Sequence, residues 1–231
     1  MAEKINGIFL TRRKHTSGSL VTTFLTDEEG LKSFYFRGGE KKSAMLYPLA
    51  EGSVIYSPNK RMDLLPMSGF ESLHPDNFAY DPRRGAIAFF IAELLMKCTT
   101  ENNPDAALYE RTSTLREALN NEDRVALLPL YALVLLMDPL GICIAVDREE
   151  HSGQVLDIQD GVIRGGIDSE KTPGGRMINW LADQLTETAS SIVLSREESN
   201  QLLRLLLHYY AEHFPGVHKM KSLEVLHETM N

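Results

Sequence analysis

The sequence contains little cysteine, no long hydrophobic segment and no excess of positive charge. Only two cysteines, Cys98 and Cys143, occur among 231 residues. Both lie in apolar segments that we expect to be helical, so we predict neither a disulfide framework nor a zinc site. The longest apolar run, Val125 to Met137, is too short to span a bilayer. No apolar segment of secretory length precedes the first charges, and we therefore expect a cytoplasmic protein without membrane contact.

Charge is distributed unevenly along the chain. The net charge is −8, but the residues up to Tyr80 include 10 basic and 9 acidic side chains, whereas the rest include 14 and 23. An acidic chain does not attract nucleic acid through its overall field, so phosphate contacts require local basic clusters. Those clusters all lie early in the chain.

The first part of the chain reads as five short strands. Runs rich in Thr, Val, Phe and Tyr flank Asp27 to Gly30, where Gly30 can supply the positive φ of a tight hairpin. Pro66 weakens the end of the fifth strand. Five strands joined by polar turns predict a small closed barrel. The predicted strands cover Ile5 to Arg13, Leu20 to Thr26, Leu31 to Arg37, Ser53 to Ser57 and Met62 to Met67.

Basic residues gather at the predicted turns of this barrel. Five-stranded barrels that bind oligonucleotides use strands two and three together with the loops between strands one and two and between strands four and five. Those two loops carry Arg12, Arg13, Lys14, Lys60 and Arg61, and the tip after the third strand adds Arg37, Lys41 and Lys42 as candidate phosphate contacts.

Three aromatic residues in a row lie on the third strand. Because strand side chains alternate, we expect Tyr35 to face outward, where it could stack on a base, and Phe34 and Phe36 to face the core. The residues alone equally allow a barrel whose aromatics are all core and whose cations only solvate its rim.

Helical patterns replace the strand patterns after Tyr80. This change predicts a barrel domain over 1–80 and a helical domain over 81–231, with an irregular insertion over 141–175. Asp81 and Pro82 suit a helix start, and Ser195 with Glu198 forms a capping box. An Asp160–Gly161 pair suits a small hairpin. The predicted helices begin near 81, 103, 122, 176, 195 and 221, with a kink or restart at Pro129.

Motifs for catalysis are absent from the sequence. No HExxH or G-x-S-x-G pattern occurs, and GGEKKS lacks the glycine spacing of a phosphate-binding loop. We therefore expect no enzymatic activity, no cofactor and no metal.

The order of landmarks resembles the RecO family of DNA repair and recombination mediators. The similarity begins with INGIFLTRRKHTSGSLVTTFLTDEEGLKSFYFRGGEKKS, a strand, a basic loop, an acidic turn and a Lys-Ser pair. It continues through FFIAELLMKC, LLMDPLG, LDIQDGVI and HYYAEHFPGVHKMKSLEVL, and so covers nearly the whole chain. Many members of that family carry four zinc-binding cysteines in the second half, whereas this chain has none after Cys143. It therefore resembles the branch without zinc.

The resemblance implies an α+β protein with an N-terminal five-stranded OB-fold barrel and an all-helical C-terminal domain. It implies no catalytic turnover, but binding to single- and double-stranded DNA, annealing of complementary strands, and loading of a recombinase onto DNA coated by single-strand-binding protein. The partners implied are RecR and the acidic C-terminal tail of single-strand-binding protein. Such a protein would act in the cytoplasm in association with the nucleoid.

A second hypothesis belongs to another class of protein. The negative net charge also fits an adaptor whose barrel has little or no affinity for DNA, and whose helical domain holds a partner's peptide in an apolar groove. Reversing the charges of Lys41 and Lys42 distinguishes the two, because only a DNA-binding mediator should then lose DNA binding.

Overall fold

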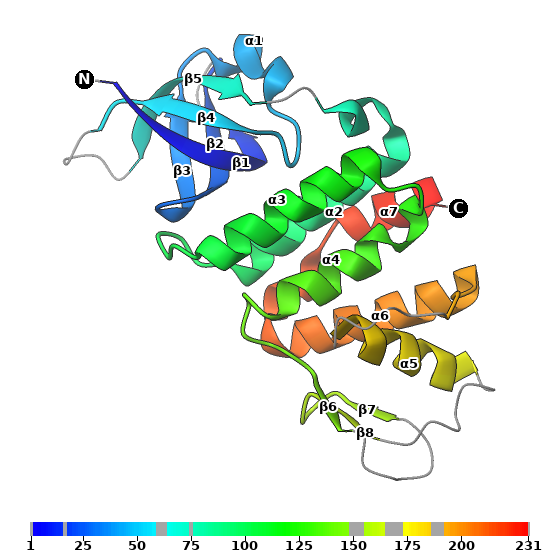
Figure 1. Cartoon of the computed structure of the whole chain (residues 1–231). Coiled ribbons are helices and arrows are strands. Elements are labelled where there is room, and N and C mark those ends of the chain that lie inside the picture. The colour runs from blue at the N-terminus through cyan, green and yellow to red at the C-terminus, as the bar shows by residue number, and fades with distance from the viewer. Residues whose placement is uncertain are drawn as a thin grey trace. The chain divides into compact units, whose positions relative to one another are not determined.

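The chain forms two compact units in the computed structural model, which describes residues 2–15, 18–58, 64–73, 76–147, 155–164, 173–185 and 192–230. The first unit comprises Met1–Leu128 together with Met220–Asn231, and the second comprises Pro129–Lys219. The C-terminal segment therefore belongs to the same unit as the N-terminal strands. Figure 1 shows the helices and strands of both units.

A closed five-stranded barrel begins the first unit. Its strands are β1 (Glu3–Lys14), β2 (Leu20–Thr26), β3 (Gly30–Phe36), β4 (Glu51–Tyr56) and β5 (Leu65–Ser72), joined in the order β1-β2-β3-β5-β4. All neighbours are antiparallel except β3 and β5, which are parallel. This is the order of an OB-fold, so the predicted barrel is confirmed.

Aromatic side chains fill the barrel interior. Phe24 packs edge-on against Phe9 and Phe34, with ring centroids 5.4 and 5.9 Å apart. Phe34 and Phe36 are 0% and 2% exposed, as the alternation along β3 predicts. The core cluster consists of Ile5, Phe9, Leu20, Phe24, Phe34, Phe36, Leu46, Ala50, Val54, Tyr56 and Met67.

The prediction for the fifth strand is wrong at its end. We expected a strand from Met62 to Met67 whose end Pro66 weakens, whereas β5 continues to Ser72; the predicted start lies outside the described residues. Pro66 lies at the second position of the strand, where its missing N–H costs little, and its carbonyl accepts a hydrogen bond from Ser57 N at 2.9 Å. The fourth strand also starts two residues before its predicted position, at Glu51.

Three longer helices pack with the barrel in the first unit: α2 (Pro82–Cys98), α3 (Ala106–Asn121) and α7 (Ser222–Met230). Asp81 caps α2 as predicted, because its carboxylate accepts from Arg83 N at 2.8 Å. Asp105, rather than the predicted Asn103, caps α3. The first unit thus includes helices as well as the barrel strands. The change from strands to helices after Tyr80 agrees with the sequence. The functional division into 1–80 and 81–231 stays a prediction.

The C-terminal helix is attached to α2 by a carboxylate. Glu93 accepts hydrogen bonds from the backbone N–H groups of Lys221 and Ser222, at 3.1 and 2.7 Å, at the start of α7. Burial alone would raise the pKa of Glu93, but the hydrogen bonds from Ser222 and Lys221 outweigh it, and the pKa is lowered. Glu93 therefore stays charged and satisfies the free N–H groups of that helix.

The second unit combines helices with a small sheet. Its helices are α4 (Leu128–Met137), α5 (Pro173–Leu185) and α6 (Arg196–His213), of which α4 starts at Leu128 rather than at the predicted Glu122. The predicted restart at Pro129 is confirmed, because the 3₁₀ helix η3 (Val125–Leu127) precedes α4 and Pro129 lies in the first turn of α4, where a proline is tolerated. Ser195 and Glu198 form the predicted capping box of α6.

The three-stranded sheet has the order β6-β8-β7, from β6 (Ala145–Asp147), β7 (Val155–Asp157) and β8 (Val162–Arg164). The hairpin predicted at Asp160–Gly161 is confirmed, and Gly161 has a φ of 62°. The parallel strand β6 was not predicted, because three residues carry too little periodicity to reveal a strand.

The two cysteines differ in their surroundings. Cys98 is buried at the end of α2, where burial raises its pKa to about 12. Cys143 is exposed and lies outside any helix, so the prediction of a helical apolar environment is wrong for it. Within the described residues, every helix is too short or too polar to cross a bilayer.

Candidate nucleic-acid interface

Most of the predicted DNA-binding residues gather at one end of the barrel. The strand register aligns Arg13 with Val21 and Val21 with Tyr35 across β1, β2 and β3. In the next row Lys14 aligns with Leu20, and Leu20 with Phe36, the last residue of β3. We refer to this part of the barrel, with Arg12, Arg13, Lys14, Tyr35, Arg37 and Lys41, as the basic end.

A short helix brings further cations to the basic end. Helix α1 (Gly39–Lys42) follows β3, and its Glu40 N donates to Gly18 O, in the β1–β2 loop, at 3.4 Å. Lys14 Nζ and Glu40 Oε1 form an ion pair of 3.1 Å. The carboxylate of Glu40 therefore offsets part of the positive charge of this end. The exposed cations here are Arg12, Arg13, Lys14, Arg37 and Lys41.

Tyr35 lies on the outer side of β3, opposite the buried Phe34 and Phe36. Its hydroxyl donates to Ser19 Oγ at 3.0 Å, and the ring of His15 meets it edge-on at 5.6 Å. The ring is half-buried against the β1–β2 loop. The outward orientation is thus confirmed, whereas stacking on a base stays a prediction.

The structure does not describe the side chains of three predicted DNA contacts. Lys60 and Arg61 lie outside the described residues, as part of 59–63. Lys42 is described only as the last residue of α1. Their contribution to the interface stays a prediction.

The opposite end of the β2–β3 face is covered by the α2–α3 loop. Asn102 N donates to Leu31 O at 3.0 Å, and Ser33 Oγ donates to Glu101 Oε1 at 3.3 Å. A Cβ added to Gly30 would lie 2.2 Å from Asn103 O, so the loop approaches the hairpin closely. We refer to this part, from Asp27 to Ser33 with the covering loop, as the covered end.

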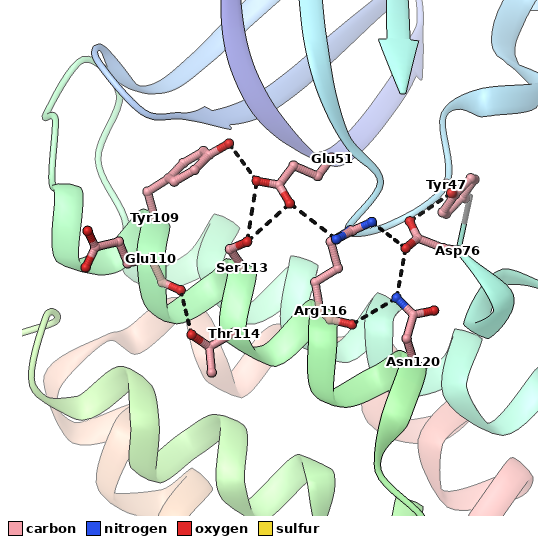
Figure 2. Close-up of polar contacts among 9 residues, drawn as sticks. All are labelled: Tyr47, Glu51, Asp76, Tyr109, Glu110, Ser113, Thr114, Arg116 and Asn120. Atoms are coloured by element: carbon pink, nitrogen blue, oxygen red, sulfur yellow. Dashed lines mark hydrogen bonds and ion pairs between the residues drawn. The ribbon is translucent and has the colours of Figure 1, made fainter. Parts of the chain in front are cut away.

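A buried ion-pair network holds α3 on the barrel (Figure 2). Arg116, on α3, lies 2.6 Å from Asp76 Oδ1 through Nη2 and 3.4 Å from Glu51 Oε2 through Nη1. The side chains of Arg116 and Asp76 are 5% and 0% exposed. Because a buried charge is costly without partners, these residues serve the fold and are not available to a ligand.

Neutral side chains complete the network. Tyr109 Oη and Ser113 Oγ donate to the carboxylate of Glu51 at 3.0 and 3.2 Å. Tyr47 Oη donates to Asp76 Oδ2 at 2.9 Å.

The network also shifts the pKa of its tyrosines. Burial, and to a smaller extent the hydrogen bond to Asp76, raises the pKa of Tyr47 to about 12. The pKa of Tyr109 is also raised, by burial and by the charge of Glu51. Both tyrosines therefore remain donors at neutral pH. Sequence analysis missed the network, because its members are far apart in the chain.

Comparison with known proteins assigns the chain to a family. The family model described as recombination protein O, C terminal, matches residues 79–224, which is more than half of the chain. The chain belongs to the recombination protein O family. It is 25% identical to the DNA repair protein RecO of Flavobacterium psychrophilum, over 100% of both chains. It is 27% identical to the DNA repair protein RecO of Bacteroides fragilis, over 99% of both. The predicted family is thus confirmed, and with it a role in DNA repair and recombination.

The family model begins where the barrel strands have ended, whereas the whole-chain relatives also cover the barrel. Barrel and helices are therefore both parts of recombination protein O. In the described residues, no group of three or more His, Cys, Asp or Glu side chains has the arrangement of a metal site.

Proposed function

We propose that this protein binds single- and double-stranded DNA through the basic end of its barrel, and that it acts by binding rather than by catalysis. One observation carries the proposal: the strand register gathers cations that are scattered in the sequence at a single end of the barrel. Exposed arginine and lysine side chains bind phosphates and displace condensed counterions, largely without regard to sequence.

Strand annealing and recombinase loading are further parts of the proposed function. A protein that neutralises the phosphates of two strands reduces their mutual repulsion, which favours annealing of complementary strands. In cells, we propose, it acts on nucleoid DNA in the cytoplasm and assists loading of a recombinase onto strands covered by single-strand-binding protein. RecR and the acidic C-terminal tail of single-strand-binding protein are the partners proposed from the family.

Fluorescence anisotropy with a labelled oligonucleotide, measured over a range of salt concentrations, tests the DNA-binding step. If about five of the cations contact phosphates, the logarithm of the binding constant should fall with the logarithm of salt with a slope of about −3.5, since each neutralised phosphate of a single strand contributes about 0.7. A flat response would rule out the phosphate contacts.

Charge reversal then locates the interface. Lys41→Glu with Lys42→Glu should abolish most of the binding, because two attractive charges become repulsive. Lys97→Glu with Arg124→Glu, at two exposed positions away from the basic end, changes the net charge by the same amount; it serves as the matched control and should bind almost as the unchanged protein does. Equal losses in both variants would indicate an effect of net charge alone.

The adaptor hypothesis stays the second candidate, supported by the Lys14–Glu40 ion pair and by the carboxylate of Glu101, which accepts a hydrogen bond from Ser33 on β3. Under that hypothesis, Lys41→Glu with Lys42→Glu would change neither DNA binding nor the binding of a protein partner. Under the mediator hypothesis, the same variant loses DNA and keeps its protein partners. Measuring both interactions on one preparation separates the two.

A further inference from the structure

A cavity of about 470 Å³ lies in the first unit, beside the segment that follows α1. One wall comes from the 3₁₀ helix η1 (Ser43–Met45), and another from η2 (Asn77–Tyr80) with the end of β5. It differs from the basic end, since the described residues that line it include no cation. The lining residues are Ala44, Met45, Tyr47, Ser72, Leu73, Asp76, Asn77, Ala79 and Tyr80.

The cavity collects three large apolar side chains that are exposed to solvent. Met45, Leu73 and Tyr80 are 45%, 50% and 90% exposed. Exposed apolar side chains that converge on one concave surface are typical of a binding site, whereas isolated ones are common on any protein. Tyr80 presents nearly all of its ring to solvent, and a flat aromatic face of this kind stacks on nucleic-acid bases.

The charges around the cavity favour a polyanion. The exposed Lys41 precedes the η1 wall, and the exposed Arg83 follows the η2 wall. The nearby carboxylates are already engaged: Asp76 with Arg116 and Tyr47, and Asp81 with Arg84 Nε at 3.4 Å. A cation therefore lies close in the sequence to each wall, and the carboxylates have their charge offset, which favours an occupant with negative charge.

We propose that the cavity is a stacking site for a base of single-stranded DNA, with the base against Tyr80, Met45 and Leu73, and the flanking phosphates near Lys41 and Arg83. The proposal rests on the proposed function and adds a second contact for the same strand. Stacking accepts any base, because every base has a π face. The hydroxyl of Ser72 and the amide of Asn77 on the wall can accept or donate hydrogen bonds to a base edge.

One strand can reach both sites. Glu40, which contacts Lys14 of the basic end, is five residues before Met45, which lines the cavity. Helical segments rise about 1.5–2 Å per residue, so the two contacts are about 10 Å apart along the chain. The nucleotides of one strand advance about 3.4 Å each along the axis of a stacked duplex, so about three nucleotides cover this distance.

The test compares Tyr80→Ala, Tyr80→Phe and Phe89→Ala in binding a labelled oligothymidylate. Phe89 is the matched control, because it is another exposed aromatic residue of the first unit and does not line the cavity. We expect Tyr80→Ala to weaken binding about tenfold, since stacking on one aromatic side chain contributes about 1–3 kcal/mol. Tyr80→Phe should keep the affinity, and Phe89→Ala should not change it. Thermal unfolding of each variant checks that Tyr80→Ala is folded.

Photo-crosslinking gives an independent measurement. An oligonucleotide that contains 5-iodouracil should form a covalent adduct that mass spectrometry assigns to Tyr80. Two results would overturn the stacking site and leave the cavity to a protein partner. The first is an oligonucleotide affinity of Tyr80→Ala within about twofold of that of the unchanged protein, and the second is crosslinked adducts at other residues only. If either result is found while the unchanged protein binds DNA with the expected slope in the salt titration, only the stacking site fails. If it binds no oligonucleotide, the proposed function fails as well.

Discussion

The two ends of the β2–β3 face share one pair of strands but differ in what lies against them. At the basic end, exposed cations follow β1 and β3, and the ion pair of Lys14 with Glu40 offsets part of their charge. At the covered end, the acidic turn Asp27–Gly30 is packed against the α2–α3 loop, and a nearby buried network joins Glu51 to α3. One end is therefore packed against other parts of the fold, and the other exposes its charges to solvent.

Arginine shows the same contrast at the level of single residues. Arg116 is buried between two carboxylates, and its charge is used within the fold. Arg13 is exposed in the row that includes Tyr35. Removing the first should affect folding, and removing the second should affect binding.

The largest effect is expected for Arg116→Ala. This change leaves the buried Asp76 and Glu51 without their cation, which should lower the free energy of unfolding by about 3–5 kcal/mol. Urea denaturation followed by circular dichroism measures the loss. Arg13→Ala is the control, and it should change the free energy of unfolding by no more than about 0.5 kcal/mol. Similar values for both variants would contradict the distinction between the two arginines.

A smaller effect is expected for Gly30→Ala at the covered end. Gly30 has a φ of 70°, and a Cβ there would lie 2.2 Å from Asn103 O. Strain and displacement of the loop should together lower the free energy of unfolding by about 1–3 kcal/mol. The same urea denaturation measures this loss.

Gly18→Ala, in the β1–β2 loop, is the matched control for Gly30→Ala. Gly18 has a similar φ of 72°, but no atom lies within 4 Å of its added Cβ. It should therefore show only the cost of a left-handed conformation, about 1 kcal/mol. If both glycine variants lose the same stability, the loop does not press on the hairpin as described.

The smallest effect on stability is expected for Glu40→Gln at the basic end. The Lys14–Glu40 pair is exposed, so the free energy of unfolding should change by no more than about 0.5 kcal/mol. DNA affinity should rise, because Lys14 becomes available to a phosphate, and the salt slope should steepen by up to about 0.7. Anisotropy titrations over salt measure both quantities. A weaker affinity would show that Glu40 supports the interface through the position of α1.

The sequence by itself determined the elements that depend on local patterns. Alternation along β3 predicted that Phe34 and Phe36 face the core, and the positive φ of Gly30 was predicted from the turn. Capping residues located the starts of α2 and α6, because a cap and the N–H groups it binds are only a few residues apart. The basic clusters and their position next to predicted turns were also visible in the sequence.

Only the tertiary structure decided which of these residues meet. Glu51, Asp76 and Arg116 are too far apart in the chain for any local pattern to pair them, and the loop that covers Leu31 comes from beyond α2. The cavity beside Tyr80 likewise depends on η1, η2 and the end of β5, which come together from separate parts of the chain. Local periodicity reports the geometry of a single element, whereas these contacts arise when the barrel closes and the helices pack against it.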